Sequence, residues 1–205
     1  MMNRRFNHLT PQYIRDRLFV WCYEVINPEQ PWLTSRSIWL LNELIKRDDI
    51  GVEFGSGRST LWLAKRMRHL TSVESDSVWY EKVRSLIHSA GLSSVVDYRK
   101  YDNESEYARQ ATLFTDNSID FCLIDGVARD QCALTMLSKI KSGGIIVVDN
   151  INWYLPNDHT RSPDSKRSRD GAASDIWAAF AKEVSVWRHI WTSNGVFDTC
   201  IWFKP

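Results

Sequence analysis

Gly51-Val-Glu-Phe-Gly-Ser-Gly-Arg-Ser-Thr60 is the stretch that decides the fold of this chain. An apolar strand leads into a tight glycine turn, and the turn opens a helix. Glycines at such a turn let the backbone approach a ligand closely, because no Cβ stands in between. The helix that follows presents free N–H groups that suit an anion. The stretch therefore predicts a ligand site at the end of a buried strand.

The glycine pattern differs from the G-x-G-x-x-G of dinucleotide-binding enzymes. Thr60 stands where the third glycine would be, and Glu53 would lie near a pyrophosphate, where like charges repel. A ligand with both a carboxylate and an ammonium fits better, since the turn amides would bind the carboxylate and Glu53 the ammonium. Glu74 ends the next apolar strand, about 20 residues on, and is placed to bind a ribose diol.

Four motifs in order carry a family resemblance: Glu53-x-Gly55-x-Gly57, Glu74, Leu123-Ile-Asp-Gly126 and Gly143-Gly-Ile-Ile-Val-Val-Asp-Asn150. Over roughly residues 30–205 they resemble the class I S-adenosylmethionine-dependent methyltransferases. The resemblance implies S-adenosylmethionine as the cofactor. It also implies that the cofactor is contacted by Glu53, Gly55, Ser56, Gly57, Ser59, Thr60, Glu74, Asp102 and Asp125. Arg58, between these positions, is expected on the helix surface.

Strand and helix signals alternate from residue 50 onward. The predicted strands are 50–54, 70–74, 95–100, 119–124, 145–148, 187–193 and 196–203. Asn194-Gly195 between the last two predicts a hairpin with a type I′ turn. The predicted fold is a three-layer α/β sandwich. Its sheet has seven strands, mostly parallel, with an antiparallel hairpin at the C-terminus and helices on both faces.

Length favours one domain of 205 residues, with a helical cap over residues 1–48 and a Rossmann-like core over residues 49–205. The cap is predicted to hold helices at 11–26 and 34–46. Residues 1–10 are expected to form a poorly ordered tail.

Composition excludes several classes of protein. The net charge of +1 offers no basic surface for nucleic acid. No stretch approaches the ~18 apolar residues of a membrane span, and the N-terminus does not resemble a signal peptide. The four cysteines show no metal spacing and are expected to be reduced core residues. These features predict a cytoplasmic protein without a membrane span.

Asp125, Asp149 and Asn150 end two apolar strands, at the sheet edge where open α/β folds bind ligands. Three oxygen ligands there suit a cation such as Mg2+. The chain resembles at these positions the cation-dependent O-methyltransferases, a group that includes catechol O-methyltransferase. The resemblance implies that Asp125 and Asp149 are catalytic and that all three residues bind the metal. Those enzymes carry a lysine base where this chain has Ala128, and Arg129 is a poor base because it stays protonated. The alternative is that Asp125 contacts the cofactor while Asp149 and Asn150 end the strand.

Trp153 and Tyr154 follow directly and are predicted to wall the acceptor pocket as substrate-binding residues. The segment 157–170 carries four basic residues without periodicity. Its composition favours a disordered, solvated loop, and the alternative is a clamp for an acidic acceptor. His159 is a candidate general base, although a histidine in a polar loop is more often incidental.

The predicted function is methyl transfer from S-adenosylmethionine to a small-molecule or glycan-like acceptor, with oxygen favoured as the methylated atom. One alternative is a cofactor-binding protein of the same fold that lacks transfer activity. The other is a nucleic-acid methyltransferase, which the sequence Asp125-Gly-Val-Ala disfavours because it lacks the motif of the base amino-methylating enzymes. The ten tryptophans are consistent with an acceptor pocket or with a homodimer interface.

Overall fold

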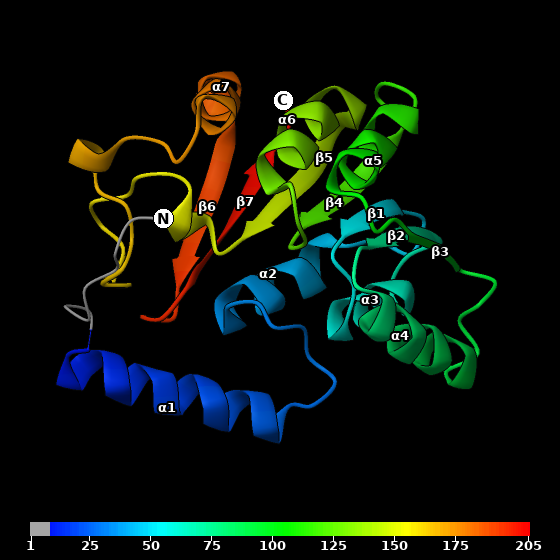
Figure 1. Ribbon diagram of the computed structural model, residues 1–205, viewed down its shortest axis with the longest axis horizontal. Helices are drawn as coiled ribbons and strands as arrows, with labels where there is room; N and C mark the ends of the chain where they lie inside the picture. Colours follow the sequence, from blue (N-terminus) through cyan, green and yellow to red (C-terminus); the bar gives the residue numbers. More distant parts are fainter. Residues whose placement is uncertain (1–8) are drawn as a thin grey trace.

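The computed structural model describes residues 9–205 and shows one seven-stranded sheet with helices on both faces (Figure 1). The strands are β1 (Ile50–Phe54), β2 (His69–Glu74), β3 (Val96–Lys100), β4 (Ile119–Ile124), β5 (Ile140–Asp149), β6 (Arg188–Ser193) and β7 (Asp198–Phe203). The helices are α1 (Pro11–Ile26), α2 (Ser35–Leu44), α3 (Arg58–Ala64), α4 (Ser77–Ser89), α5 (Glu104–Arg109), α6 (Arg129–Lys139) and α7 (Asp175–Glu183). The expected N-terminal tail lies outside the described residues, apart from its last two positions.

The strand order is β3-β2-β1-β4-β5-β7-β6. Strands β1 to β5 are parallel, and β7 runs antiparallel between β5 and β6. The strand order runs β1-β2-β3 in one direction from β1 and β4-β5 in the other. Open α/β folds bind their ligands at such a point, beyond the carboxyl ends of the two central strands. The predicted sheet and its antiparallel C-terminal hairpin are confirmed.

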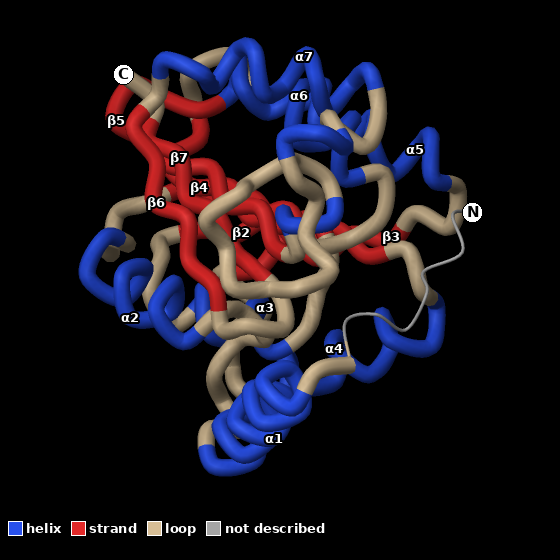
Figure 2. The backbone as a smooth tube through the Cα atoms, turned by 90° about the vertical axis from the view of Figure 1, so that its left-hand side faces the viewer, coloured by secondary structure: helices blue, strands red, loops and turns tan. Residues whose placement is uncertain are grey.

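Two apolar cores cover the two faces of the sheet. Figure 2 shows the sheet from the side, with helices on either face of it. Along β4, Cys122 and Ile124 belong to the core that α5, α6 and α7 cover. Phe121 and Leu123 belong to the opposite core, with α2, α3 and α4. Successive side chains of a strand point to opposite faces, so burial of both faces requires an apolar run like this one.

The C-terminal hairpin has a longer turn than predicted. Four residues, 194–197, connect β6 and β7. Gly195 has a φ of +86°, but Asn194 is not among the residues with positive φ. The Asn194 side chain instead accepts hydrogen bonds from the amides of Val196 and Phe197 at 2.9 and 3.0 Å. The two-residue type I′ turn is therefore wrong, because Asn194 stabilises the turn through its side chain.

Helix and strand boundaries differ in several places. α3 ends at Ala64, and the side chain of Asp76 caps α4. The short helix α5 was not predicted, because six residues are too few to show a period. β5 begins at Ile140, five residues before the predicted strand 145–148, so Gly143-Gly144 lies within the strand.

The N-terminal region forms the two expected helices, and α1 matches the predicted bounds. No described helix is both long enough and apolar enough to cross a membrane. All four cysteines are free. Cys122, Cys132 and Cys200 are buried, whereas Cys22 is exposed on α1 and so is not the core residue expected.

Candidate functional site

The carboxyl ends of four adjacent strands bring the predicted site residues to one edge of the sheet. Gly55 follows β1, Glu74 ends β2, Asp125 follows β4 and Asp149 ends β5. Hydrogen bonds between neighbouring strands continue into the turns, since the Gly55 amide donates to the carbonyl of Val73 at 2.9 Å. The site is therefore built on the most regular part of the fold.

The glycine turn packs directly against the turn after β4. Gly55 has a φ of +93°, in the region that favours glycine. A Cβ on Gly55 would stand 2.6 Å from the amide nitrogen of Gly126. A Cβ on Gly126 would collide with the hydroxyl of the buried Tyr107. Both positions need glycine because two backbones meet there, a contact of which the sequence gives no sign.

Glu53 is fully buried on β1, two residues before the turn. Its Oε2 accepts hydrogen bonds from the hydroxyls of Thr60 at 2.6 Å and Ser72 at 2.7 Å. Its Oε1 has no hydrogen-bond partner among the described residues. Burial raises the pKa of Glu53 to about 7, although the neighbouring hydroxyls lower it. Since an unpaired buried oxygen costs free energy, Oε1 fits the predicted role of accepting from an ammonium group.

Glu74 is buried and joins the end of β2 to the glycine turn. Its Oε2 accepts from the amide of Ser56 at 3.0 Å and from the hydroxyl of Ser56 at 2.7 Å. Its Oε1 accepts from the amides of Ser75 and Asp76 at 2.7 and 2.8 Å. A ribose hydroxyl that bound Oε2 would take the place of the Ser56 hydroxyl.

Ser59 and Thr60 lie buried in the first turn of α3. The hydroxyl of Thr60 accepts from the amide of Gly57 at 2.9 Å while it donates to the buried acid on β1. Thr60 therefore caps the helix and orients the carboxylate with the same oxygen, as its spacing from the glycines suggests.

Arg58 connects the glycine turn to the N-terminal helix, which corrects the expectation of a plain surface residue. Its guanidinium donates to the main-chain carbonyl of Glu24 in α1 at 3.1 Å and lies 5.2 Å from the ring centroid of Trp32. Trp32 stacks on Trp79, whose indole donates to the carbonyl of Ser56 at 2.8 Å. The turn is thus held from the side of the helical cap as well.

Arg129 lies among the three predicted metal ligands. Its guanidinium is 2.9 Å from the carboxylate of Asp125 and donates to the Asn150 side chain at 3.2 Å and to the Asp149 carbonyl at 2.6 Å. Ala128, with a φ of +45°, turns the chain so that α6 begins at Arg129. A guanidinium stays protonated, so a positive charge already stands where the oxygen ligands converge.

The residues do not fit a bound Mg2+, which corrects the metal prediction for Asp125, Asp149 and Asn150. The Asp149 carboxylate accepts a hydrogen bond from the hydroxyl of Thr199 at 2.5 Å instead of joining the others. A cation placed beside Arg129 would be repelled by it. Within residues 9–205, no three His, Cys, Asp or Glu side chains are grouped to hold a metal ion.

The two acids at this edge have raised pKa values. Burial raises the pKa of Asp125 to about 6, although the charge of Arg129 lowers it. Burial raises the pKa of Asp149 well above its usual value, and the charge of Asp125 raises it further. Asp125 is therefore the acid of the pair that ionises first. It is also the accessible one, since 29% of its side chain is exposed while Asp149 is buried.

Residues 52–151 of this sequence match a protein family described as a methyltransferase domain. The match contains the glycine turn, Glu74, Asp125, Arg129 and Asp149. The chain carries a class I S-adenosylmethionine-dependent methyltransferase domain. A search of curated proteins finds no matching sequence.

Solved structures share the fold of this methyltransferase at low sequence identity. A candidate caffeoyl-CoA O-methyltransferase from Staphylococcus aureus is 14% identical with a TM-score of 0.60, covering 97% of this chain and 94% of that one. The O-methyltransferase TomG from Streptomyces achromogenes, solved with S-adenosylmethionine, is 17% identical with a TM-score of 0.57, covering 82% and 77%. A candidate O-methyltransferase from Klebsiella pneumoniae is 16% identical with a TM-score of 0.57, covering 96% and 91%.

Tyr154 and Trp153 of the methyltransferase make different contacts. Tyr154 stacks on Trp177 with ring centroids 4.9 Å apart, and the guanidinium of Arg129 lies 5.9 Å from the Tyr154 ring. Trp153 donates its indole N–H to Asp164 at 3.0 Å. Tyr154 therefore lies beside Arg129, and its contact with an acceptor stays a prediction, whereas Trp153 secures the following loop.

The segment 157–170 is held by hydrogen bonds, contrary to the disordered loop that its composition favours. The buried carboxylate of Asp198 on β7 accepts from the hydroxyl of Thr160 at 2.5 Å. Arg161 forms an ion pair of 2.9 Å with Asp16 of α1. These contacts tie the segment to the sheet and to the helical cap, which composition alone does not reveal.

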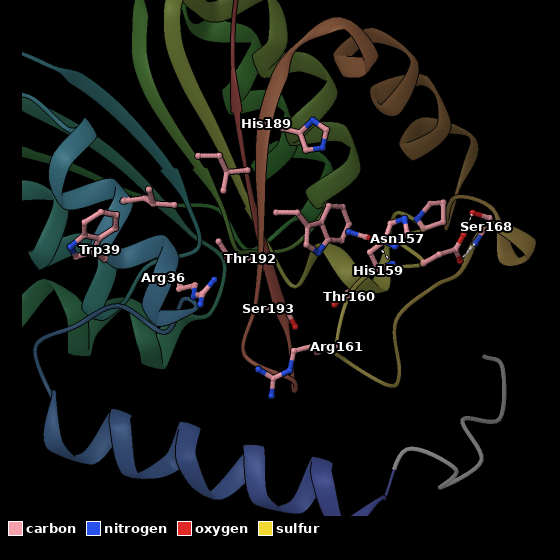
Figure 3. Close-up of a pocket in the computed structure, with 15 residues that line it drawn as sticks. Arg36, Trp39, Asn157, His159, Thr160, Arg161, Ser168, His189, Thr192 and Ser193 are labelled. Carbon is pink, nitrogen blue, oxygen red and sulfur yellow. Dashed lines mark hydrogen bonds between the residues drawn. The ribbon is translucent and has the colours of Figure 1, made fainter.

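A pocket of about 1100 Å³ lies around the edge strand β6 (Figure 3). Arg36 and Trp39 of α2 line one side of this strand, and Asn157 and His159 line the other. β6 is two strands away from β5, so the pocket lies about 10 Å from the end of β5 across the sheet. The structure thus places the predicted base His159 in this pocket.

Asp102 lies at the carboxyl end of the neighbouring strand β3 and is exposed. A hydrogen bond from Lys100, at 3.0 Å, lowers the pKa of its carboxyl, and the hydroxyl of Ser77 donates to it at 3.1 Å. Contact between Asp102 and the adenosine end of the cofactor stays a prediction.

Cofactor binding to the methyltransferase is expected to weaken in acid. The carboxyl of Glu53, with its pKa near 7, is mostly protonated at about pH 6, and a neutral carboxyl cannot form an ion pair with an ammonium. The dissociation constant for S-adenosylhomocysteine should therefore rise about tenfold between about pH 7.5 and about pH 6.

Calorimetric titration over this pH range checks the expectation. Glu53→Gln should bind more weakly at neutral pH and lose most of the pH dependence. Asp125→Asn is the matched control, because Asp125 is the other nearby acid with a raised pKa. This variant should keep the pH dependence of S-adenosylhomocysteine binding. Equal affinity of the unaltered protein at both ends of the range contradicts the role of Glu53.

Proposed function

We propose that the protein transfers a methyl group from S-adenosylmethionine to a hydroxyl oxygen of a small-molecule or glycan-like acceptor. The observation that carries the proposal is the pair of buried carboxylates, Glu53 and Glu74, on either side of the glycine turn. Glu53 has an oxygen without a partner, and Glu74 binds the hydroxyl of Ser56. These features support binding of an ammonium and of a ribose diol, two polar groups that this cofactor carries on its methionine and its ribose.

The proposed cofactor contacts follow from the elements that carry them. Glu53 binds the ammonium group, the amides of the glycine turn bind the carboxylate, and Glu74 binds the ribose. The remaining cofactor-binding residues in the proposal are Gly55, Ser56, Gly57, Ser59, Thr60, Asp102 and Asp125.

When bound, S-adenosylmethionine supplies a methyl group on a sulfonium, which is already a good leaving group. The chain has to hold an acceptor hydroxyl in line with that methyl group. Asp125 would accept the hydroxyl proton while the acceptor oxygen bonds to the methyl carbon, the sulfur–methyl bond breaks and S-adenosylhomocysteine leaves. Its pKa of about 6 suits a base that works near neutral pH. Arg129 and Asp149, which contact Asp125 or its partners, act as positioning residues.

The acceptor is proposed to lie against Tyr154, beside Asp125. The pocket around β6 lies about 10 Å further along the sheet, so an acceptor with more than one ring or sugar unit would reach both. Trp153 supports this wall indirectly through the loop. We also propose that the protein is cytoplasmic, in line with its free cysteines, and that it forms a homodimer.

Incubation with S-adenosylmethionine labelled in the methyl group tests the reaction. We expect label in hydroxylated small molecules, phenols and short glycans included, and none in RNA or DNA. Label in nucleic acid would favour the nucleic-acid methyltransferase. Micromolar cofactor binding without transfer to any acceptor class would favour the inactive cofactor-binding protein, and no binding at all would overturn the proposal.

Replacing Glu74 with alanine is expected to weaken S-adenosylhomocysteine binding by about 100-fold or more, because two charge-assisted hydrogen bonds to the ribose are lost. Calorimetric titration measures the change. Glu74 also accepts from the amides of Ser75 and Asp76, so unfolding is followed in parallel.

Asp76→Ala is the matched control, since Asp76 caps α4 next to Glu74. It should lower the free energy of unfolding by about 1 kcal/mol and leave the cofactor affinity almost unchanged. If Glu74→Ala binds S-adenosylhomocysteine as the unaltered protein does, Glu74 does not bind the ribose.

A further inference from the structure

One face of α1 is apolar and exposed along its whole length. Ile14, Leu18, Trp21 and Val25 are 52%, 58%, 60% and 59% exposed. A run of large apolar side chains open to solvent on a single helix marks an interaction surface. We call these four residues the α1 seam.

α1 is fixed to the body of the protein by its other side, so the seam has a defined orientation. Asp16 and Val20 are buried. Asp16 pairs with Arg161 of the loop after β5, and Glu24 receives the hydrogen bond from Arg58 on its carbonyl. Figure 1 shows α1 running along the lower edge of the molecule, set apart from the sheet.

The spacing of the seam residues is 4, 3 and 4. This is the spacing of the apolar positions in a coiled coil, where two helices pack side by side. The seam spans about 17 Å, or 11 steps of the helical rise. It therefore fits one partner helix of similar length better than an irregular protein surface.

Charges beside the seam indicate what the partner is. Arg17 and Glu24 lie one heptad apart, on the same flank of the seam. In an antiparallel pair of identical helices this flank meets its own copy, so Arg17 lies opposite the partner's Glu24, and the symmetry repeats the pair. In a parallel pair this flank faces the other flank, where Arg17 would meet the uncharged Cys22. Arg15 on that flank is already paired with Asp16 of its own helix. An anionic membrane surface would attract Arg17 but repel Glu24.

We propose that the α1 seam binds the α1 seam of a second copy of this chain, antiparallel and around a twofold axis. The inference rests on the homodimer proposed above and names its interface, and it is independent of the transfer reaction. Ile14 lies beside the partner's Val25, and Leu18 beside the partner's Trp21. Because so short a seam buries little area, we expect a micromolar dimer that dissociates on dilution.

Sedimentation velocity over about 1 to about 200 μM protein tests the interface. The unaltered protein should shift from monomer to dimer in this range. Trp21→Glu should raise the dimer dissociation constant at least tenfold. Val186→Glu is the matched control, because Val186 is an exposed apolar residue away from α1, and it should change nothing. A monomer throughout overturns both the dimer and the seam, and a dimer that Trp21→Glu leaves intact overturns the seam alone.

A charge exchange tests the antiparallel arrangement. Arg17→Glu should weaken the dimer about tenfold, because two acidic pairs replace two ion pairs, and the double variant Arg17→Glu, Glu24→Arg should restore it. A double variant as weak as the single one overturns this arrangement. Flotation with phosphatidylcholine–phosphatidylglycerol vesicles serves as the second readout. If the monomeric protein binds these vesicles and Trp21→Glu abolishes the binding, the seam contacts a lipid surface instead of a second copy. Unchanged S-adenosylhomocysteine affinity of each variant shows that it is folded.

Discussion

Arg129→Ala is expected to lower the free energy of unfolding by about 3 kcal/mol and to open a cation site that the unaltered protein lacks. Arg129 donates to three main-chain carbonyls, those of Asp125, Gly126 and Asp149, besides its pairing with the Asp125 carboxylate. Its side chain is only 14% exposed. Removing one partner of a largely buried ion pair leaves the other charge uncompensated, which is strongly destabilising.

Without the guanidinium, Asp125 and Asn150 would face the crevice without their cation. Mn2+, a spectroscopic probe for Mg2+, should then bind the variant, as electron paramagnetic resonance would detect, and should not bind the unaltered protein. Denaturant unfolding measures the loss of stability, and Arg169→Ala, at a highly exposed arginine, is the control that should change neither quantity. If the unaltered protein binds Mn2+ tightly and Asp125→Ala abolishes that binding, Arg129 does not occupy the position between Asp125 and Asn150 in solution.

Gly55→Ala is expected to abolish detectable cofactor binding and to cost about 3 kcal/mol of stability or more. Two effects add: the positive φ of +93° disfavours any residue with a Cβ, and that Cβ would stand 2.6 Å from the amide nitrogen of Gly126. Backbone atoms cannot move aside as a flexible side chain can. The two turns would have to separate, and they lie at the proposed cofactor site.

Gly91→Ala separates the two effects. Gly91 has a similar φ of +69°, but a Cβ there meets nothing within 4 Å. It should cost about 1 kcal/mol through conformation alone and leave cofactor binding intact. Unfolding in denaturant and calorimetric titration with S-adenosylhomocysteine measure both variants. Equal costs for Gly55→Ala and Gly91→Ala would show that the close contact between the turns carries no energy.

The sequence predicted the elements whose signals are local. Apolar runs such as 119–124 become central strands because a parallel strand buries both faces. A continuous apolar run therefore predicts such a strand without knowledge of the neighbouring strands. The glycine turn and the acids at the strand ends follow from chain order, since parallel strands deliver their carboxyl ends to one edge. The C-terminal hairpin was also predicted from a local signal, the pair Asn194-Gly195 between two apolar runs. Its turn type was not, because the Asn194 side chain stabilises the turn by accepting a backbone hydrogen bond.

Contacts between distant segments decided the rest. The pattern Asp125, Asp149 and Asn150 is typical of a metal site, yet Arg129 reaches all three from the start of α6, a direction set by the left-handed turn at Ala128. The basic loop 157–170 looks disordered by composition, yet Asp198 and Asp16 hold it from two other elements.

By itself, then, the sequence determined that this chain forms a seven-stranded α/β sheet with a glycine turn after its first strand, because strand burial and turn geometry are properties of short segments. Only the tertiary structure decided that an arginine takes the place predicted for a metal, that Gly55 and Gly126 pack together, and that α1 presents its apolar seam to solvent. These features depend on which side chains of distant segments meet, and neither periodicity nor composition records the distance between them.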